Sequence, residues 1–395
     1  MTDSDRGFAA REAPEPRAPI YLDYNATTPV DPEVADVIGT HLRGTFGNPS
    51  SSHAYGAAAH RTLAEARSHV AKLLGAASDE IVFTAGGSES DNLAIKGVVF
   101  ARRGHGDHII TTAVEHPAVL NTCRWLAARC GVRLTVLPVD GHGQVDPDAV
   151  ARAIESGTVL VTVMHANNEV GTLNPIAEIA RICRERAVTL HTDAAQSVGK
   201  VPTQVEHLGA DLLTVAGHKL YAPKGIGALW IREGVVLDSL VHGAGHERGH
   251  RAGTENVPYA AGLGHASSLC ADRLAVESER LSALRDRLHA RLAEAVPGLS
   301  LNGHPRDRLP NTLNVSFPGV DGEELLAATP EVAASTGSAC HAGRTDPSGV
   351  LTAMGLPSAR ALGAVRLTVG RWSTEAEVDC AAELLAASWR KPRRA

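Results

Sequence analysis

Two stretches near the middle of the chain decide its fold: VTLHTD at Val188–Asp193 and LLTVAGHK at Leu212–Lys219. Each is a β-rich run that leads into a polar residue, Asp193 in the first and Lys219 in the second. Similar runs alternate with helical patterns from about residue 80 to 232. The other runs are Ile81–Thr84, Ile109–Thr112, Leu134–Leu137, Val159–Met164 and Ala228–Ile231, and Ile176–Arg186 is a typical helical pattern between them. This alternation predicts an α/β fold with a large, mostly parallel sheet covered by helices on both faces, and any ligand at the carboxyl ends of the strands.

The pattern changes after Pro258, which indicates a second, smaller α/β domain. One long helix is expected because Leu281, Leu284, Leu288 and Leu292 form an apolar stripe. It is followed by a strand at Leu313–Phe317, a short helix near Glu323–Ala328, a loop containing Cys340, a strand at Val365–Val369 and a helix from Glu375. We therefore expect a disordered lead-in at 1–18, a large domain at 19–270 whose first residues pack on the small domain, and a small domain at 271–395.

Composition excludes several classes of function. The 395 residues carry a formal net charge of -6, which gives no general attraction to nucleic acid or anionic membranes. No apolar stretch approaches the roughly 18–20 residues of a membrane span, and the acidic, Pro-rich start resembles neither a signal nor a transit peptide. A cytoplasmic protein with reduced thiols is expected.

The six cysteines fall into two groups. Five lie in helix-like patterns and are interpreted as small buried hydrophobic residues: Cys123, Cys130, Cys183, Cys270 and Cys380. Cys340 lies instead in STGSACHAG, at 335–343, a small-residue segment that is typical of an exposed, mobile loop. None of the spacings between cysteines suggests a metal site.

Asp193 and Lys219 together suggest a site for pyridoxal 5'-phosphate (PLP). A lysine amine can bond to the aldehyde of this cofactor, and a buried carboxylate can keep the pyridine nitrogen protonated. The strand Ile81–Thr84 runs into AGGSESDN at 85–92, where Gly87 lets the backbone approach an oxyanion and Ser88 can cap the following helix. An ordinary capped turn is the alternative, but beside Asp193 and Lys219 a phosphate site is the better interpretation.

Further polar residues follow other strands. His116 can stack on a cofactor ring and move protons, although a structural role is the alternative. Asn168 can orient a ring hydroxyl or a substrate carboxylate, and Arg366 can hold a carboxylate through its two-pronged guanidinium, with Arg371 as a competitor. The histidines at 242, 246 and 250 resemble metal ligands, but the segment between them is too rich in glycine for a helix. No metal site is predicted.

These segments together resemble the cysteine desulfurase family, within the class V aminotransferase group of PLP enzymes. The resemblance runs from Tyr21 to about Ala387, and its most specific motif is Thr336–Cys340. The other motifs, in order, are Tyr21–Pro29, Gly47–Ser51, Thr84–Asn92, Met164–Glu169, Asp193–Gln196, Gly217–Lys219, His246–Arg248 and Arg251–Thr254. The fold that this resemblance implies is the aspartate aminotransferase-like fold (fold type I) of PLP-dependent transferases.

The resemblance also implies a role for each matching residue. Lys219 would bond to the cofactor, Asp193 would pair with the pyridine nitrogen, Gln196 would touch the ring oxygen, and His116 would stack on the ring and serve in catalysis. Gly87, Ser88 and His218 would bind the phosphate with Thr254 of the other subunit of a homodimer, and Asn168 and Arg366 would hold the substrate carboxylate. Cys340 would accept sulfur from L-cysteine as a persulfide, leaving L-alanine, and pass it to an acceptor protein that the sequence does not identify.

Two alternatives stay open. Ala339–His341 and Gly253–Asn256 resemble selenocysteine lyase, which releases selenide and alanine, and a non-catalytic scaffold subunit is a second alternative. The chain also departs from the family. Ala216 stands where many relatives carry Ser, Pro117 follows the ring-stacking histidine, and the long tail that docks an iron–sulfur scaffold is missing. Iron–sulfur assembly, tRNA thiolation and a biosynthetic pathway are all possible destinations for the sulfur.

Overall fold

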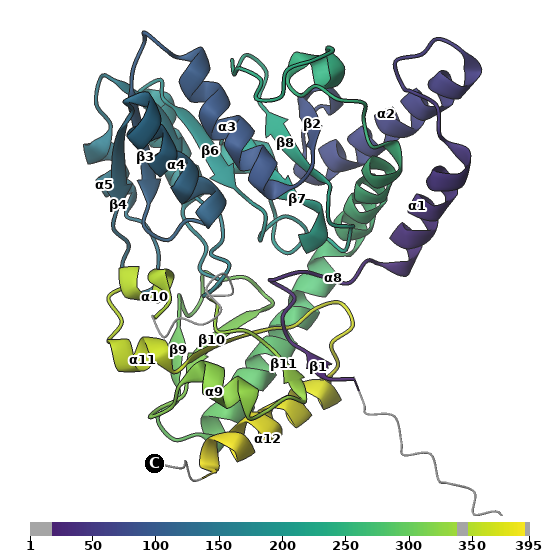
Figure 1. The fold of residues 1–395 in the computed structure, drawn as a ribbon. Coiled ribbons are helices and arrows are strands. Elements are labelled where there is room, and N and C mark those ends of the chain that lie inside the picture. The colour runs from purple at the N-terminus through teal and green to yellow at the C-terminus, as the bar shows by residue number, and fades with distance from the viewer. Residues whose placement is uncertain (1–17, 338–346, 392–395) are drawn as a thin grey trace, which may run out of the picture.

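A seven-stranded sheet forms the centre of the upper part of the molecule in Figure 1, a computed structural model that describes residues 18–337 and 347–391. The strand order is β2-β8-β7-β6-β5-β3-β4. Its strands are β2 (Ile81–Thr84), β3 (His108–Thr112), β4 (Arg133–Leu137), β5 (Thr158–Thr162), β6 (Thr189–Asp193), β7 (Leu212–Ala216) and β8 (Gly227–Ile231). Only β8 is antiparallel to its neighbours β2 and β7. The predicted parallel sheet is confirmed, and each predicted strand lies within two residues of the observed one.

Helices cover both faces of this sheet, because neighbouring strand residues point to opposite sides. Ile110 and Val161 pack with residues of α2 and α6, whereas their neighbours Ile109 and Leu160 pack with α3 and α4. The helices of this part are α1 (Pro32–Gly44), α2 (Ala54–Leu74), α3 (Gly87–Ala101), α4 (Pro117–Cys130), α5 (Pro147–Ala153), α6 (Ile176–Glu185) and α7 (Val205–Leu208). Short 3-10 turns lie at η1 (Ser78–Glu80), η2 (Gly217–Lys219) and η3 (His246–Gly249).

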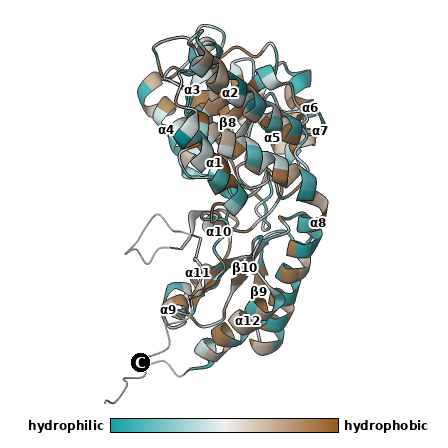
Figure 2. Ribbon diagram, turned by 90° about the vertical axis from the view of Figure 1, so that its right-hand side faces the viewer, coloured by the Kyte–Doolittle hydropathy of each residue, from teal (hydrophilic) through white to brown (hydrophobic). Residues whose placement is uncertain are grey.

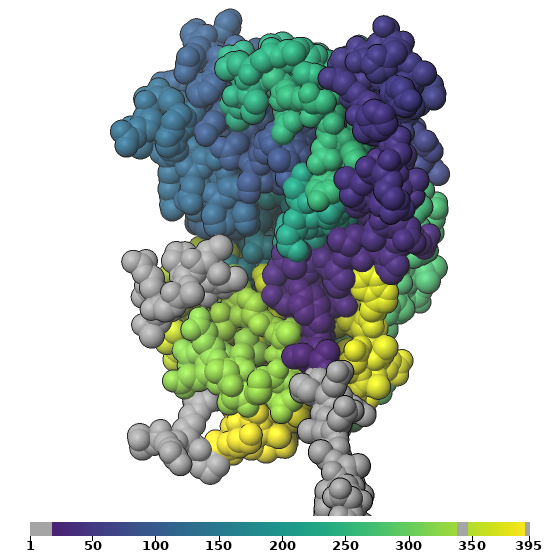
Figure 3. Space-filling model, turned by 45° about the vertical axis from the view of Figure 1, so that its right-hand side comes forward, coloured from purple at the N-terminus to yellow at the C-terminus, as the bar shows by residue number. Residues whose placement is uncertain are grey.

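The C-terminal part is built on a second, antiparallel sheet in the order β12-β10-β9. Its elements are β9 (Ser300–Asn302), β10 (Thr312–Ser316), α9 (Gly322–Ala327), α10 (Gly349–Ala353), α11 (Ser358–Leu362), β12 (Ala364–Thr368) and α12 (Glu375–Arg390). The start of the described chain joins this part: β1 (Ile20–Tyr21) pairs in parallel with β11 (Val332–Ala333). Figure 3 shows the purple N-terminal segment running down the surface from the upper part to the lower one.

One helix of 39 residues, α8 (Val257–Ala295), connects the two parts (Figure 2). Cys270 belongs to the core of the first sheet, and Leu281 belongs to the core of the second. The four leucines of the predicted stripe are all buried in the second core. Near its start α8 packs so tightly on α2 that a Cβ on Gly264 would lie 2.6 Å from Ala66 Cα. The proposed domain boundary after residue 270 therefore falls inside a continuous helix.

The cysteine predictions are partly wrong. Cys123, Cys183 and Cys270 are buried, but Cys130 and Cys380 are exposed because they lie on the solvent side of α4 and α12. These five thiols are free, and Cys340 lies outside the described residues, as does the expected lead-in up to residue 17. Within the described ranges, each helix is either too short or too polar to cross a membrane.

Candidate active site

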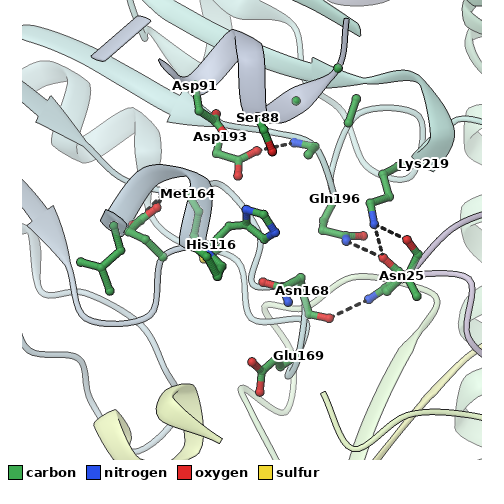
Figure 4. A pocket seen from close by; sticks show the side chains of 18 of the residues that line it. Asn25, Ser88, Asp91, His116, Met164, Asn168, Glu169, Asp193, Gln196 and Lys219 are labelled. Carbon is green, nitrogen blue, oxygen red and sulfur yellow. Dashed lines mark hydrogen bonds between the residues drawn. The ribbon is translucent and has the colours of Figure 1, made fainter. Parts of the chain in front are cut away.

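A cavity of about 1000 Å³ opens at the carboxyl ends of β6 and β7, where the sequence predicts a ligand (Figure 4). Polar residues from both parts of the chain line it. Nine of the predicted site residues do so: Gly87, Ser88, His116, Asn168, Asp193, Gln196, His218, Lys219 and Arg366. The fold thus brings together predicted residues that are up to 279 positions apart in the sequence, from Gly87 to Arg366.

Lys219 ends the 3-10 turn η2, which directly follows β7 and places its side chain at the end of the strand. Its Nζ donates hydrogen bonds to the main-chain oxygens of Asn25, at 2.5 Å, and Ala26, at 2.7 Å. Burial, and secondarily the positive charge of Arg366, lowers the pKa of Lys219 from 10.5 to about 8. Roughly a tenth of the amine is therefore uncharged at pH 7. The uncharged amine is the nucleophilic form.

Asp193 and His116 form the second feature of the site. Asp193 ends β6 and accepts a hydrogen bond from Ala195 N at 2.9 Å. His116 is the N-cap of α4, and its Nδ1 accepts a hydrogen bond from Ala118 N at 3.1 Å. Because Nδ1 is an acceptor here, the neutral ring carries its proton on Nε2. Burial raises the pKa of Asp193 and lowers that of His116, and each group opposes the shift of the other.

Asp91, on α3, lies behind this pair and was missed by the sequence interpretation. It is fully buried, and among the described residues its Oδ1 has no hydrogen-bond partner. Burial and the charge of Asp193 raise the pKa of Asp91 well above its usual value, so the uncharged carboxyl is favoured. A signal was available: Asp91 follows Gly87 by four residues and so lies on the same face of the helix.

The potential ligand atoms of Asp91, His116 and Asp193 lie within 4.8 Å of one another, a spacing that a metal ion would accept. Metal ligation needs deprotonated carboxylates, however, and burial raises the pKa of both aspartates. An aromatic cation such as a protonated pyridine needs only one charged carboxylate. The arrangement therefore fits a nitrogen heterocycle better than a metal.

The first turn of α3 forms an anion cradle. Its N-cap is Gly86, whose φ of 148° favours glycine, and a Cβ on Gly87 would meet the Cβ of Ala216 at 3.2 Å. Free N–H groups and the helix dipole attract a phosphate at such a helix start. Ser88 was expected to cap this helix, which is wrong: it lies inside the first turn, because the glycines already end the preceding extended segment.

His218 and Thr254, the other predicted phosphate ligands, differ in position. His218 lines the cavity, with Nδ1 3.2 Å from Thr27 Oγ1, and burial lowers its pKa to about 4, so it is neutral. Thr254 is exposed and does not line the cavity. In its own chain, therefore, Thr254 is not placed to contact a ligand in this site.

Arg366 and Asn168 line the cavity side by side. Arg366 is buried, with Nη2 2.7 Å from Asp23 Oδ1 and Nη1 donating to Asn168 O at 3.0 Å. Its Nε has no partner among the described residues. Arg371, the competitor, pairs instead with Asp31 and lies over the Tyr221 ring, outside this cavity. Arg366 is therefore the better placed of the two for a substrate carboxylate.

Glu169 contacts described residues on both sides of the Cys340 segment, Gly337 and Ser348. Gly337 lines the cavity, and a Cβ on it would lie 2.9 Å from Glu169 Oε2. The same oxygen accepts a hydrogen bond from Ser348 Oγ. The described residues on both sides of the Cys340 segment therefore lie at one buried carboxyl group on the cavity wall.

Glu115 was not predicted from the sequence as a site residue. It is buried beside His116, accepts a hydrogen bond from Thr112 Oγ1 at 2.6 Å, and receives Met164 N at 3.0 Å on both oxygens. Burial raises the pKa of Glu115 to about 8. These bonds join the ends of β3 and β5, so Glu115 fixes the backbone from which His116 projects.

The residues that line the cavity fit PLP. An amine is present for the aldehyde (Lys219), a buried carboxyl for the pyridine nitrogen (Asp193), a neutral ring for stacking (His116), and a helix start for the phosphate. In Figure 4 the His116 ring lies between Asp193 and Asn168, while Lys219 and Gln196 converge on Asn25. These chemistries are all required by one cofactor and are seldom needed together otherwise.

Comparisons with known proteins agree with this interpretation. The family model Aminotransferase class-V matches residues 20–380. A protein named cysteine desulfurase IscS from Methanosarcina thermophila is 46% identical over 368 residues, which cover 93% of this chain and 91% of that protein. One with the same name from Anaeromyxobacter dehalogenans is 46% identical over 380 residues, covering 95% and 94%.

Solved structures also match most of the chain. A structure titled "NIFS-LIKE PROTEIN" has a TM-score of 0.88 and 35% identity, and the match covers 93% of this chain and 98% of that one. A structure titled "SspA in complex with cysteine" has a TM-score of 0.79 and 37% identity, covering 88% and 98%. The family match at residues 20–380 therefore spans both parts of the chain and the whole range of the residues that line the cavity.

Proposed function

Since the chain belongs to the aminotransferase class-V family, we propose on that premise that it is a PLP-dependent cysteine desulfurase, which converts L-cysteine to L-alanine and transfers the sulfur to Cys340. The observation that carries the proposal is that Lys219, Asp193 and His116 line one cavity, which Arg366 also lines. The cysteine desulfurases that the chain resembles match it along more than nine-tenths of its length.

When bound, PLP supplies an electron sink that stabilises negative charge at the substrate Cα. Asp193 would remain charged by pairing with the protonated pyridine nitrogen, and the first turn of α3 would hold the phosphate. Arg366, which lines the cavity with Asn168 beside it, would hold the substrate carboxylate through its guanidinium. These contacts would fix Cα close to Lys219.

Lys219 would act first as the anchor of the cofactor and then as the general base that removes the Cα proton. Its lowered pKa, about 8, keeps an uncharged amine available for this proton transfer. The neutral His116 ring carries its proton on Nε2 and none on Nδ1. It would receive the proton of a thiol or return it. Both groups would therefore work near neutral pH.

Cys340 would attack the substrate sulfur as a thiolate. The bond between Cβ and sulfur of the substrate breaks, and a bond forms between that sulfur and the sulfur of Cys340. Overall, the hydrogen that the Cys340 thiol loses is the one that the methyl group of alanine gains. The products are L-alanine and a persulfide on Cys340. Support comes from the cavity wall, because the chain enters and leaves the Cys340 segment beside Glu169.

The proposal also includes a homodimer, an acceptor protein for the sulfur and a cytoplasmic location. The exposed Thr254 would complete the phosphate site of a second copy of the chain, and the persulfide would pass to an acceptor protein. A cytoplasmic location would keep the reactive thiol reduced, in keeping with the five unpaired cysteines of the described residues.

An assay of alanine and sulfide release tests this function. The purified, PLP-loaded enzyme would be given L-cysteine or L-selenocysteine with a thiol reductant, beside its Lys219→Ala variant. Equimolar alanine and sulfide from cysteine, lost in the variant, is expected. An enzyme that is inert toward cysteine but active on selenocysteine would be a selenocysteine lyase, and one inert toward both would be a scaffold subunit.

A further inference from the structure

Lys200 is a buried lysine with no role in the scheme above. Only 6% of its surface is exposed, and its Nζ donates two hydrogen bonds, both to Gln196: one to the main-chain oxygen and one to Oε1, each at 3.0 Å. It does not line the main cavity but lies behind it, on a small second cavity that Lys219 and Cys270 also line. Burial of a charged group is unfavourable, so a buried lysine amine is expected to have a structural or functional role.

The two bonds from Lys200 fix which way the Gln196 amide points. A lysine ammonium has three donors and no acceptor, so the amide oxygen has to face Lys200. The amide nitrogen then faces the other way, and Nε2 donates to Asn25 O at 2.9 Å. Since an amide nitrogen carries two hydrogens and Gln196 lines the main cavity, the group offered to a ligand is a donor.

Asn25 O links this arrangement to Lys219. The same main-chain oxygen accepts from Gln196 Nε2 and from Lys219 Nζ. The chain of contacts therefore runs from Lys200 through Gln196 and Asn25 to the amine that would anchor the cofactor. Burial, and then the charge of Lys219, lowers the pKa of Lys200 to about 7. Charged or neutral, the amine retains hydrogens for both bonds.

We propose that Lys200 is a positioning residue that locks Gln196 with its N–H toward the ring oxygen of PLP. This inference rests on the proposed function. An N–H donor stabilises the deprotonated form of the ring oxygen, whereas a carbonyl in the same place would repel it. Without Lys200 the amide would be held only by the bond from Nε2 to Asn25 O, and its oxygen would lose a buried partner.

The test uses full-length enzyme loaded with PLP and compares four forms with the wild type: Lys200→Met, Gln196→Met, the double variant, and Lys72→Met as an exposed control on α2. The visible absorption of the bound cofactor is titrated with pH, and cofactor release is followed during dilution. Lys200→Met should raise the pKa of the visible transition by about one unit and speed cofactor release roughly tenfold. Lys72→Met should leave both unchanged.

The double variant decides whether Lys200 acts through Gln196. Its effect should equal that of Gln196→Met alone, because coupled residues are not additive. An additive effect, or an unchanged pKa in folded Lys200→Met, would overturn the inference. If Lys200→Met does not fold, Gln196→Glu takes its place, because this variant keeps an oxygen partner for Lys200 and replaces only the N–H group by oxygen. The pKa of its visible transition should rise by the same amount. An unchanged pKa in Gln196→Glu would overturn the inference. A wild-type enzyme that binds no PLP would contradict the proposed function instead.

Discussion

The lowered pKa of Lys219 should let the cofactor-free enzyme capture PLP covalently at a pH where an ordinary lysine hardly reacts. Only the uncharged amine attacks an aldehyde. With a pKa of about 8 instead of 10.5, half of Lys219 is uncharged at pH 8. For an ordinary lysine the uncharged fraction at that pH is roughly 0.3%, so capture should be about 150-fold faster than expected from the solvent-exposed side chain.

Rapid mixing of the cofactor-free enzyme with PLP measures this directly. The initial rate at which the visible absorption appears is recorded over a pH series from about 6 to 10. The rate should rise about tenfold per pH unit well below 8 and level off above it, with a midpoint near the pKa of Lys219. Lys219→Ala should show no such band, because it removes the amine.

Two results would refute this reasoning. A midpoint near 10.5 would mean that burial does not lower the pKa of Lys219, and that Lys219 is exposed in the cofactor-free enzyme. An unchanged band in Lys219→Ala would mean that another lysine is the anchor. Lys224, which also lines the cavity, would then be the first to examine.

Three further outcomes are expected. Cys340→Ala should retain PLP and still bind cysteine, but its rate of sulfide release should fall by at least about a hundredfold. Its turnover of selenocysteine should fall less, because a selenol leaves more readily. Equal cysteine turnover in variant and parent would remove Cys340 from the mechanism. Thr254→Ala should weaken PLP retention in a dimer, and full activity of a strictly monomeric fraction by light scattering would contradict the shared site. Burial raises the pKa of Glu115 from 4.5 to about 8, so its stabilising contribution is complete below pH 4.5 and lost as the pH rises through about 8. Urea unfolding of Glu115→Gln should therefore show the variant gaining on the order of 4 kcal/mol relative to wild type between about pH 5 and 8.5. A constant difference would show that Glu115 does not titrate in this range.

The strands and long helices could be predicted because their signal is local. Hydrophobic runs at the seven strands of the large sheet and the leucine stripe of α8 are read from neighbouring residues alone. The two-residue strands β1 and β11 are too short to show any period, and they pair across more than 300 residues. Ser88 failed as a cap for a similar reason, since both serine and glycine are good N-caps and only the backbone angles decide.

The chemistry of the site was predictable in part, because polar residues at strand ends attract notice. Asp193 and Lys219 are conspicuous after their apolar runs. Asp91 is not, because a carboxylate in the first turns of a helix usually faces water and favours the helix dipole. Only the sheet packed above it shows that Asp91 is buried against Asp193.

The N-terminal segment shows what no local pattern could supply. Asn25 acts through its main-chain oxygen, which accepts from both Lys219 and Gln196, and a carbonyl oxygen is present in every residue. Two positions earlier, Asp23 pairs with Arg366 from the far end of the chain. The segment can reach all of these groups because β1 fastens it to the C-terminal part while the Lys219 turn holds its other end. The cofactor side and the substrate side of the site are therefore joined by one short stretch of backbone, so a change that loosens this stretch should disturb the anchoring lysine and the carboxylate-binding arginine together.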